Sequence, residues 1–179
     1  MRKTSLFFVF LVLMLGLHAF SSTYAVTTDN QIVLLKDDGT WGKVTLKENI
    51  RGLKEVDVDV PFILGDIAIT IKQVLRHEEF LVLDVFIVNN GTEIADADTL
   101  SYGFDIRDSE GYNYSSGYIS GIPDEYCNKS LVGKIRPRGY IRGYIFFKIA
   151  KDVEIRELYV TYWFDTTFVD ISKIEPREL

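Results

Sequence analysis

The segment 80–92 constrains the fold of this chain more than any other feature of its sequence. It reads Phe-Leu-Val-Leu-Asp-Val-Phe-Ile-Val-Asn-Asn-Gly-Thr. A run of β-branched and aromatic residues that ends in a polar Asn-Gly sequence is typical of a strand closed by a turn. Alternate residues from Leu81 to Ile87 would line a core, and the other face is also apolar apart from Asp84. We therefore expect a central strand that is covered on both faces, with Asp84 outward-facing or paired.

Other segments repeat the period of two that is typical of strands. The pattern occurs at residues 67–71, 102–107, 140–149 and 156–164, and 167–171 would add a last edge strand. In 156–164 it places Leu158, Val160, Tyr162 and Phe164 inward. Because no segment keeps a helical apolar period over three turns, the sequence predicts an all-β protein, with an immunoglobulin-like β-sandwich over residues 61–179.

The first 60 residues divide into a processing segment and an extension. Arg2 and Lys3 precede the apolar run 6–20, and small residues lead up to Ala25. This pattern predicts a signal peptide over residues 1–25, cleaved before Val26, and hence a secreted or periplasmic protein without membrane insertion after cleavage. Residues 26–60 would form an amino-terminal β-hairpin extension with an Asp-Gly turn, followed by a linker in which a short helix is the alternative.

Composition argues against several classes of function. The chain has 26 acidic and 20 basic residues, and this acidic excess disfavours nucleic acid as a partner. Cys127 is the only cysteine, so no internal disulfide can form. After signal cleavage His77 is the only histidine, which leaves too few ligands for a Cys/His zinc site. We expect no enzyme activity and no cofactor.

Three motifs carry a resemblance to a known family. They are the turn Val88-Asn-Asn-Gly-Thr92, the hairpin Asp108-Ser-Glu-Gly-Tyr-Asn-Tyr114, and the turn Pro137-Arg-Gly139 followed by Gly143-Tyr-Ile-Phe-Phe147. From Gly65 to about Ser172 the chain resembles secreted bacterial and archaeal domains of unknown function with a telokin-like immunoglobulin fold (DUF4352-like). Arg138 departs from the Pro-Gly pattern of that family. The resemblance implies a fold and brings no catalytic residues.

Tyrosines mark the candidate contact surface. They lie in or beside a long Gly- and Ser-rich stretch without a clear period, and that composition is typical of adaptable recognition loops. The alternative is that the loop folds over a sheet edge and the rings cover the core. We interpret the chain as an exported, non-enzymatic module that binds or scaffolds a protein or glycan at the cell envelope. The candidate ligand-binding residues are Tyr102, Tyr112, Tyr114, Tyr118 and Tyr126.

Clustered carboxylates support two alternative functions. Calcium takes oxygen ligands, so these acids could hold a metal in a calcium-stabilised adhesion or glycan-binding module. A pair of them could also serve a carboxylate-dependent hydrolase. Solvated acids in turns are the remaining interpretation. The candidate metal ligands are Asp96, Asp98, Asp105 and Asp108.

Overall fold

A computed structural model describes residues 24–27, 31–36, 38–49 and 51–178. Of the predicted signal peptide only Tyr24 and Ala25 fall within this range, so most of that segment lies outside the described residues. Within the described part of the chain, no helix has both the length and the apolar character needed to cross a membrane.

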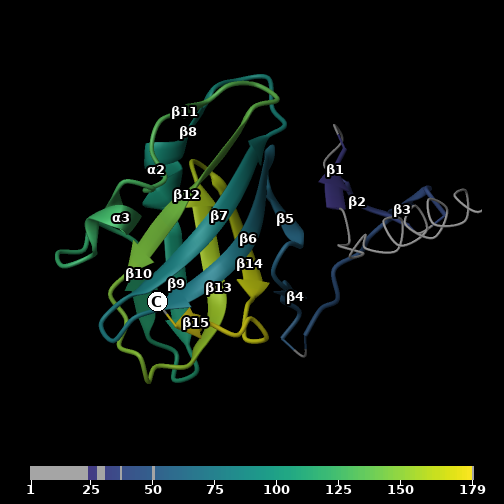
Figure 1. Cartoon of the computed structure of the whole chain (residues 1–179). Helices are drawn as coiled ribbons and strands as arrows, with labels where there is room; N and C mark the ends of the chain where they lie inside the picture. Colours follow the sequence, from purple (N-terminus) through teal and green to yellow (C-terminus); the bar gives the residue numbers. More distant parts are fainter. Residues whose placement is uncertain (1–23, 28–30, 37, 50, 179) are drawn as a thin grey trace, which may run out of the picture.

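Two five-stranded sheets form the protein, and the predicted all-β, immunoglobulin-like sandwich is confirmed (Figure 1). Most neighbouring strands are antiparallel; β15 pairs with β6, and β4 with β14, in parallel. One sheet has the order β12 (Tyr140–Phe147), β7 (Leu81–Asn89), β6 (Ile67–Arg76) and β15 (Arg177–Glu178), with β5 (Pro61–Leu64) also on β6. The other has the order β10 (Asn113–Ser115), β9 (Phe104–Asp108), β13 (Ile155–Tyr162), β14 (Asp165–Asp170) and β4 (Lys54–Glu55).

Smaller elements flank the sandwich. The predicted amino-terminal hairpin is present as β2 (Ile32–Leu35) and β3 (Trp41–Lys43), and β1 (Tyr24–Val26) adds a third strand to it. Beyond β7, β8 (Ala95–Asp96) pairs with β11 (Lys134–Ile135) and leads into α2 (Ala97–Ser101). A second short helix, α3 (Asp124–Cys127), lies in the segment between β10 and β11. We call that segment, residues 116–133, the α3 loop.

The strand β7 lies between β6 and β12 and is apolar on both faces, as the sequence predicts. Its inner residues Leu81, Leu83, Val85 and Ile87 belong to the main core between the sheets. On its outer face Phe80 and Val82 pack in a second cluster with Leu75, Ile122 and Phe146. Ile122 comes from the α3 loop, so this loop covers one end of the outer face.

Two segments differ from their expected form. Residues 47–60, predicted as a linker, contain β4 and the buried core residue Val56. The inward placement predicted for Phe164 is wrong, because β13 ends at Tyr162 and Phe164 is 99% exposed. The chain reverses there, since Trp163 adopts φ +56°.

An ion pair between a buried carboxylate and a half-exposed guanidinium explains the aspartate that interrupts β7. Asp84 is 1% exposed, and its two carboxylate oxygens accept hydrogen bonds from Nε and Nη2 of Arg142, at 2.9 and 2.6 Å. Such a bidentate contact between a guanidinium and a carboxylate is one of the strongest hydrogen-bonded pairs in proteins. Asp84 is therefore paired, as expected, and it ties β7 to β12.

Removing Arg142 should destabilise the fold, because a buried carboxylate would lose its counter-charge. We expect Arg142→Ala to lower the free energy of unfolding, measured by urea denaturation, by about 1 to 3 kcal/mol. The loss is smaller than for a fully buried pair because the guanidinium is more than half exposed. The control Lys148→Ala, at an exposed residue that follows the same strand, should change it by less than about 0.5 kcal/mol. Equal losses of unfolding free energy for Arg142→Ala and Lys148→Ala would contradict this account. A second test adds Asp84→Leu to Arg142→Leu: the double variant should be more stable than Arg142→Leu alone, because it no longer buries an unpaired carboxylate.

Asp108 closes the β9–β10 hairpin and should make stability depend on acid pH. Its carboxylate accepts hydrogen bonds from the backbone N–H of Glu110 and Tyr112, both at 2.9 Å, and from the Tyr114 hydroxyl at 3.0 Å. Burial raises the pKa of Asp108, but these hydrogen bonds outweigh it, so the pKa lies below its ordinary value. A carboxyl with a lowered folded pKa stabilises the fold above its unfolded pKa, about 3.9, and loses this effect as the pH falls through the folded value.

We therefore expect Asp108→Asn to melt at a lower temperature than the wild type at pH 7. The difference should narrow as the pH falls below about 4, where the wild-type carboxyl also becomes protonated. Melting curves followed by circular dichroism between neutral and acid pH measure both effects. Glu110→Gln, in the same turn but exposed, is the control and should leave the melting temperature unchanged. A gap between Asp108→Asn and wild type that stays constant across this range would contradict the assignment.

Candidate functional site

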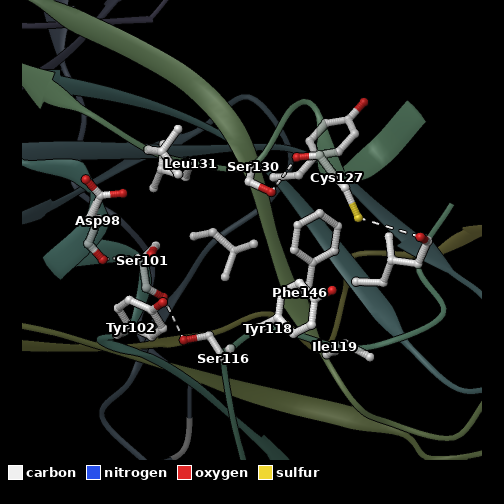
Figure 2. Close-up of a pocket in the computed structure, with 15 residues that line it drawn as sticks. Asp98, Ser101, Tyr102, Ser116, Tyr118, Ile119, Cys127, Ser130, Leu131 and Phe146 are labelled. Carbon is white, nitrogen blue, oxygen red and sulfur yellow. Dashed lines mark hydrogen bonds between the residues drawn. The ribbon is translucent and has the colours of Figure 1, made fainter. Parts of the chain in front are cut away.

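The α3 loop, α2 and β12 enclose a pocket of about 270 Å³, which we call the α3 pocket (Figure 2). The α3 loop supplies Ile119, Ile122 and Leu131, and β12 supplies Ile145 and Phe146. The first two loop residues and Phe146 also belong to the outer cluster that covers β7. The pocket is thus a space left where the loop packs over the outer face of the sheet.

Pairing with the edge of β12 holds the loop in place. Tyr144 donates its N–H to the carbonyl of Lys129 at 2.7 Å and accepts the N–H of Leu131 at 3.0 Å. Close approach is possible because position 143 is glycine: a Cβ there would lie 2.7 Å from the Cα of Leu131. The glycine of the Gly143-Tyr-Ile-Phe-Phe motif therefore allows one wall of the pocket to form.

The polar groups of the pocket are largely occupied within the protein. Ser116 and Ser130 donate their hydroxyl protons to the carbonyls of Ser101 and Cys127, at 2.6 and 2.7 Å (Figure 2). The Cys127 thiol points to the carbonyl of Ile122 at 3.6 Å. A hydroxyl whose proton is already donated has only acceptor capacity left for a ligand. The pocket therefore offers a ligand chiefly apolar surface.

The structure brings three of the five predicted tyrosines to this site. Tyr102 and Tyr118 line the pocket and are 68% and 90% exposed. Tyr126 does not line the pocket, but its ring stacks on that of the pocket residue Tyr144, with ring centroids 5.9 Å apart. Burial and the neighbouring Glu125 raise the pKa of the Tyr126 hydroxyl. These rings belong to one surface although they come from separate segments.

The other two predicted tyrosines lie on the β9–β10 hairpin. Tyr112 is exposed there, whereas Tyr114 is half-buried and donates its hydroxyl to Asp108. The pocket residues that sequence reasoning missed include Val132, Tyr144 and Phe146. The period of two along 140–149 places Tyr144 and Phe146 on the face opposite the core. Two aromatic residues on an outer face are the signal in the sequence that another segment covers them.

The four predicted metal ligands are placed in two pairs. Asp96 caps α2, accepting the N–H of Thr99 at 3.2 Å, and its contact with Lys134 lowers its pKa. Asp98 accepts the N–H of Gly133 at 3.2 Å, while Asp105 and Asp108 belong to β9. Among the described residues, no group of three or more His, Cys, Asp or Glu side chains is arranged to hold a metal ion.

One solved structure, the first of the three similar structures below, supports the fold. The yjhA protein of Bacillus subtilis matches at a TM-score of 0.52 with 16% identity, over 65% of this chain and 98% of that one. A putative lipoprotein, ycdA, of the same species has a TM-score of 0.48 and 19% identity, over 62% of this chain and 38% of that one. The secreted protein MPT63 of Mycobacterium tuberculosis has a TM-score of 0.43 and 10% identity, over 84% of this chain and 92% of that one.

No curated protein matches this chain. A family model described as a domain of unknown function (DUF4352) matches residues 56–168, which is more than half of the 179 residues. That match begins at Val56, the core residue beside β4, and ends within β14. It thus spans both sheets of the sandwich, and the chain belongs to the DUF4352 family.

Proposed function

We propose that this chain is an exported, non-enzymatic binding module, and that its α3 pocket receives an apolar side chain of a protein partner at the cell envelope. One observation carries the proposal: the exposed rings of Tyr102 and Tyr118 stand at the rim of a pocket with an apolar lining. Aromatic residues around a desolvated pocket are typical of the centres of protein interfaces. That the protein is exported is inferred from the signal peptide predicted over residues 1–25.

The chemistry of the pocket supports a protein partner over a sugar. Sugars are recognised through hydroxyl hydrogen bonds. The three serine hydroxyls of the lining all donate to backbone carbonyls, so a sugar would depend on the tyrosine hydroxyls and on Asp98. Val132, 58% exposed at the same rim, adds further apolar surface. The volume is also below the roughly 300 to 1,000 Å³ of pockets for drug-sized ligands. A single apolar side chain suits such a pocket.

The same residues support a binding role over catalysis. Nucleophilic catalysis requires a base beside the nucleophile. None of the residues that line the α3 pocket is a histidine, and His77 stacks on Phe80 with ring centroids 4.3 Å apart in the turn before β7. Asp98 supplies a carboxylate to the lining and accepts a backbone N–H. The three serines of the lining donate their hydroxyl protons to backbone carbonyls, and none of the hydrogen bonds described for the Asp98 carboxylate comes from a serine or from Cys127.

A photo-crosslinking amino acid at position 118 tests the proposal in intact cells. We expect a discrete protein adduct from position 118 and none from position 112, because Tyr112 is exposed on the separate β9–β10 hairpin. Val132→Asp, which places a charge at the exposed pocket rim, should abolish the adduct without unfolding the protein. With the partner purified, Tyr118→Ala should weaken binding about tenfold or more. Equal adduct yields at the two positions, or an adduct that survives Val132→Asp, would contradict the proposal.

The calcium alternative makes a separate prediction. Because the four acids lie in two separate places and form no group of three ligands among the described residues, we expect the melting temperature to be the same in calcium and in EDTA. A ligand at a hundredfold its dissociation constant adds about 2.7 kcal/mol, which for a domain of this size is a shift of about 5 to 11 °C. A shift of that size with calcium, reversed by the chelator, would favour a calcium-stabilised module instead.

A further inference from the structure

Two large aromatic residues form the turn between β13 and β14. Tyr162 and Asp165 are the last paired residues of the two strands, so Trp163 and Phe164 alone make the connection. Their exposed fractions are 70% and 99%. Ile94, 62% exposed, lines the same hollow as Trp163. The end of a hairpin is thus an exposed aromatic surface.

The backbone of this turn disfavours the residue that occupies it. Trp163 has φ +56°, in the left-handed region where a Cβ clashes with the backbone. Two-residue hairpin turns therefore favour Gly, Asn or Asp at such positions. Folding alone gives no reason for tryptophan here, and an observed backbone outlier of this kind points to a functional constraint.

Neighbouring groups hold the indole in a defined place. The Tyr162 ring packs edge-on against it, with ring centroids 6.0 Å apart and planes at 70°. The Tyr162 hydroxyl in turn accepts the backbone N–H of Asp96 at 2.8 Å. The contact with Tyr162 restricts the indole before any ligand binds, which limits the entropy lost on binding.

A hollow of about 220 Å³ lies beside the indole. Tyr162 and Trp163 line it, and its polar lining residues include three carboxylates, Asp66, Glu93 and Asp165, beside Asn89 and Thr92. Asp165 packs so closely against Gly65 that a Cβ at that position would collide with its carboxylate. Asp66 likewise lies against Gly91, where a Cβ would be 3.0 Å from its Oδ2. Two of the carboxylates are thus packed against the backbone of turns.

From this combination we propose that the β13–β14 turn binds a neutral oligosaccharide. An indole face packs against the C–H face of a sugar ring, because both surfaces are apolar. Ionised carboxylates are acceptors only, and they form strong hydrogen bonds with hydroxyl donors. The same carboxylates repel phosphate and anionic lipid headgroups. A ligand with apolar faces, many hydroxyl donors and no negative charge satisfies all three conditions.

This site is independent of the proposed function. No residue that lines the hollow also lines the α3 pocket, so either site can fail while the other holds. The chain has two tryptophans, Trp41 and Trp163. In a Trp41→Phe background Trp163 is therefore the only indole, and its fluorescence reports on the turn alone.

The test titrates purified Trp41→Phe protein with three uncharged probes: chitohexaose, cellohexaose and mannohexaose. We expect a saturable change in the emission of Trp163 with at least one of them. Trp163→Asn should reduce the affinity of that sugar at least tenfold by calorimetry, and Glu93→Gln should reduce it less. Tyr112→Ala, at an exposed tyrosine on the β9–β10 hairpin that lines neither pocket, is the matched control and should bind the sugar as the wild type does.

Trp163→Asn also separates binding from folding. Asparagine tolerates the left-handed conformation, so this variant should melt at the same or a higher temperature than the wild type. A lower melting temperature would show a structural role for the indole and overturn the proposal. Absence of a saturable change with all three sugars would also overturn it. So would a blue shift of Trp163 on phosphatidylcholine vesicles without any response to sugar, which would assign the turn to membrane contact.

Discussion

The apolar outer face of β7 is the constraint on which the rest of the structure depends. A central strand with apolar residues on both faces must be covered twice, once by the opposite sheet and once by something else. The opposite sheet covers Leu81, Leu83, Val85 and Ile87. The α3 loop covers Phe80 and Val82. Asp84, the next residue on the same face, can be buried because Arg142 pairs with it. The α3 pocket exists because an irregular loop cannot pack over a strand as tightly as a second sheet does.

The elements that local patterns specify were predictable from the sequence. Period-two alternation identified the strands around β6, β7 and β12, and the Asp108–Gly111 turn predicted the β9–β10 hairpin, in which Gly111 indeed has φ +95°. The pairing of Asp84 followed from one charged residue in an apolar run. Each of these inferences needs only neighbours in the chain, which is why a single sequence contains them.

The site itself depends on contacts between distant segments. Tyr102, Tyr118 and Tyr144 meet only because the α3 loop returns along the edge of β12, and no period in the sequence encodes that return. The two-residue strands β4 and β15 are too short to show a pattern. Phe164 was misplaced because the alternation was extended past the end of the strand. The chain reverses at Trp163, and tryptophan is not a residue type that signals a turn.

The turns of this protein also show where folding and binding make different demands. At the reversals that contain Gly39, Gly65 and Gly111, the residue with positive φ is a glycine, the type that adopts this conformation without strain. Trp163 occupies the equivalent conformation between β13 and β14, with a side chain that contributes exposed surface and little burial. Asp59 and Arg138 are the other described residues with positive φ that are not glycine, and Arg138 is the position that departs from the Pro-Gly pattern. A turn that served only to reverse the chain would be more stable with glycine or asparagine, so the tryptophan is best explained by what it contacts outside the molecule.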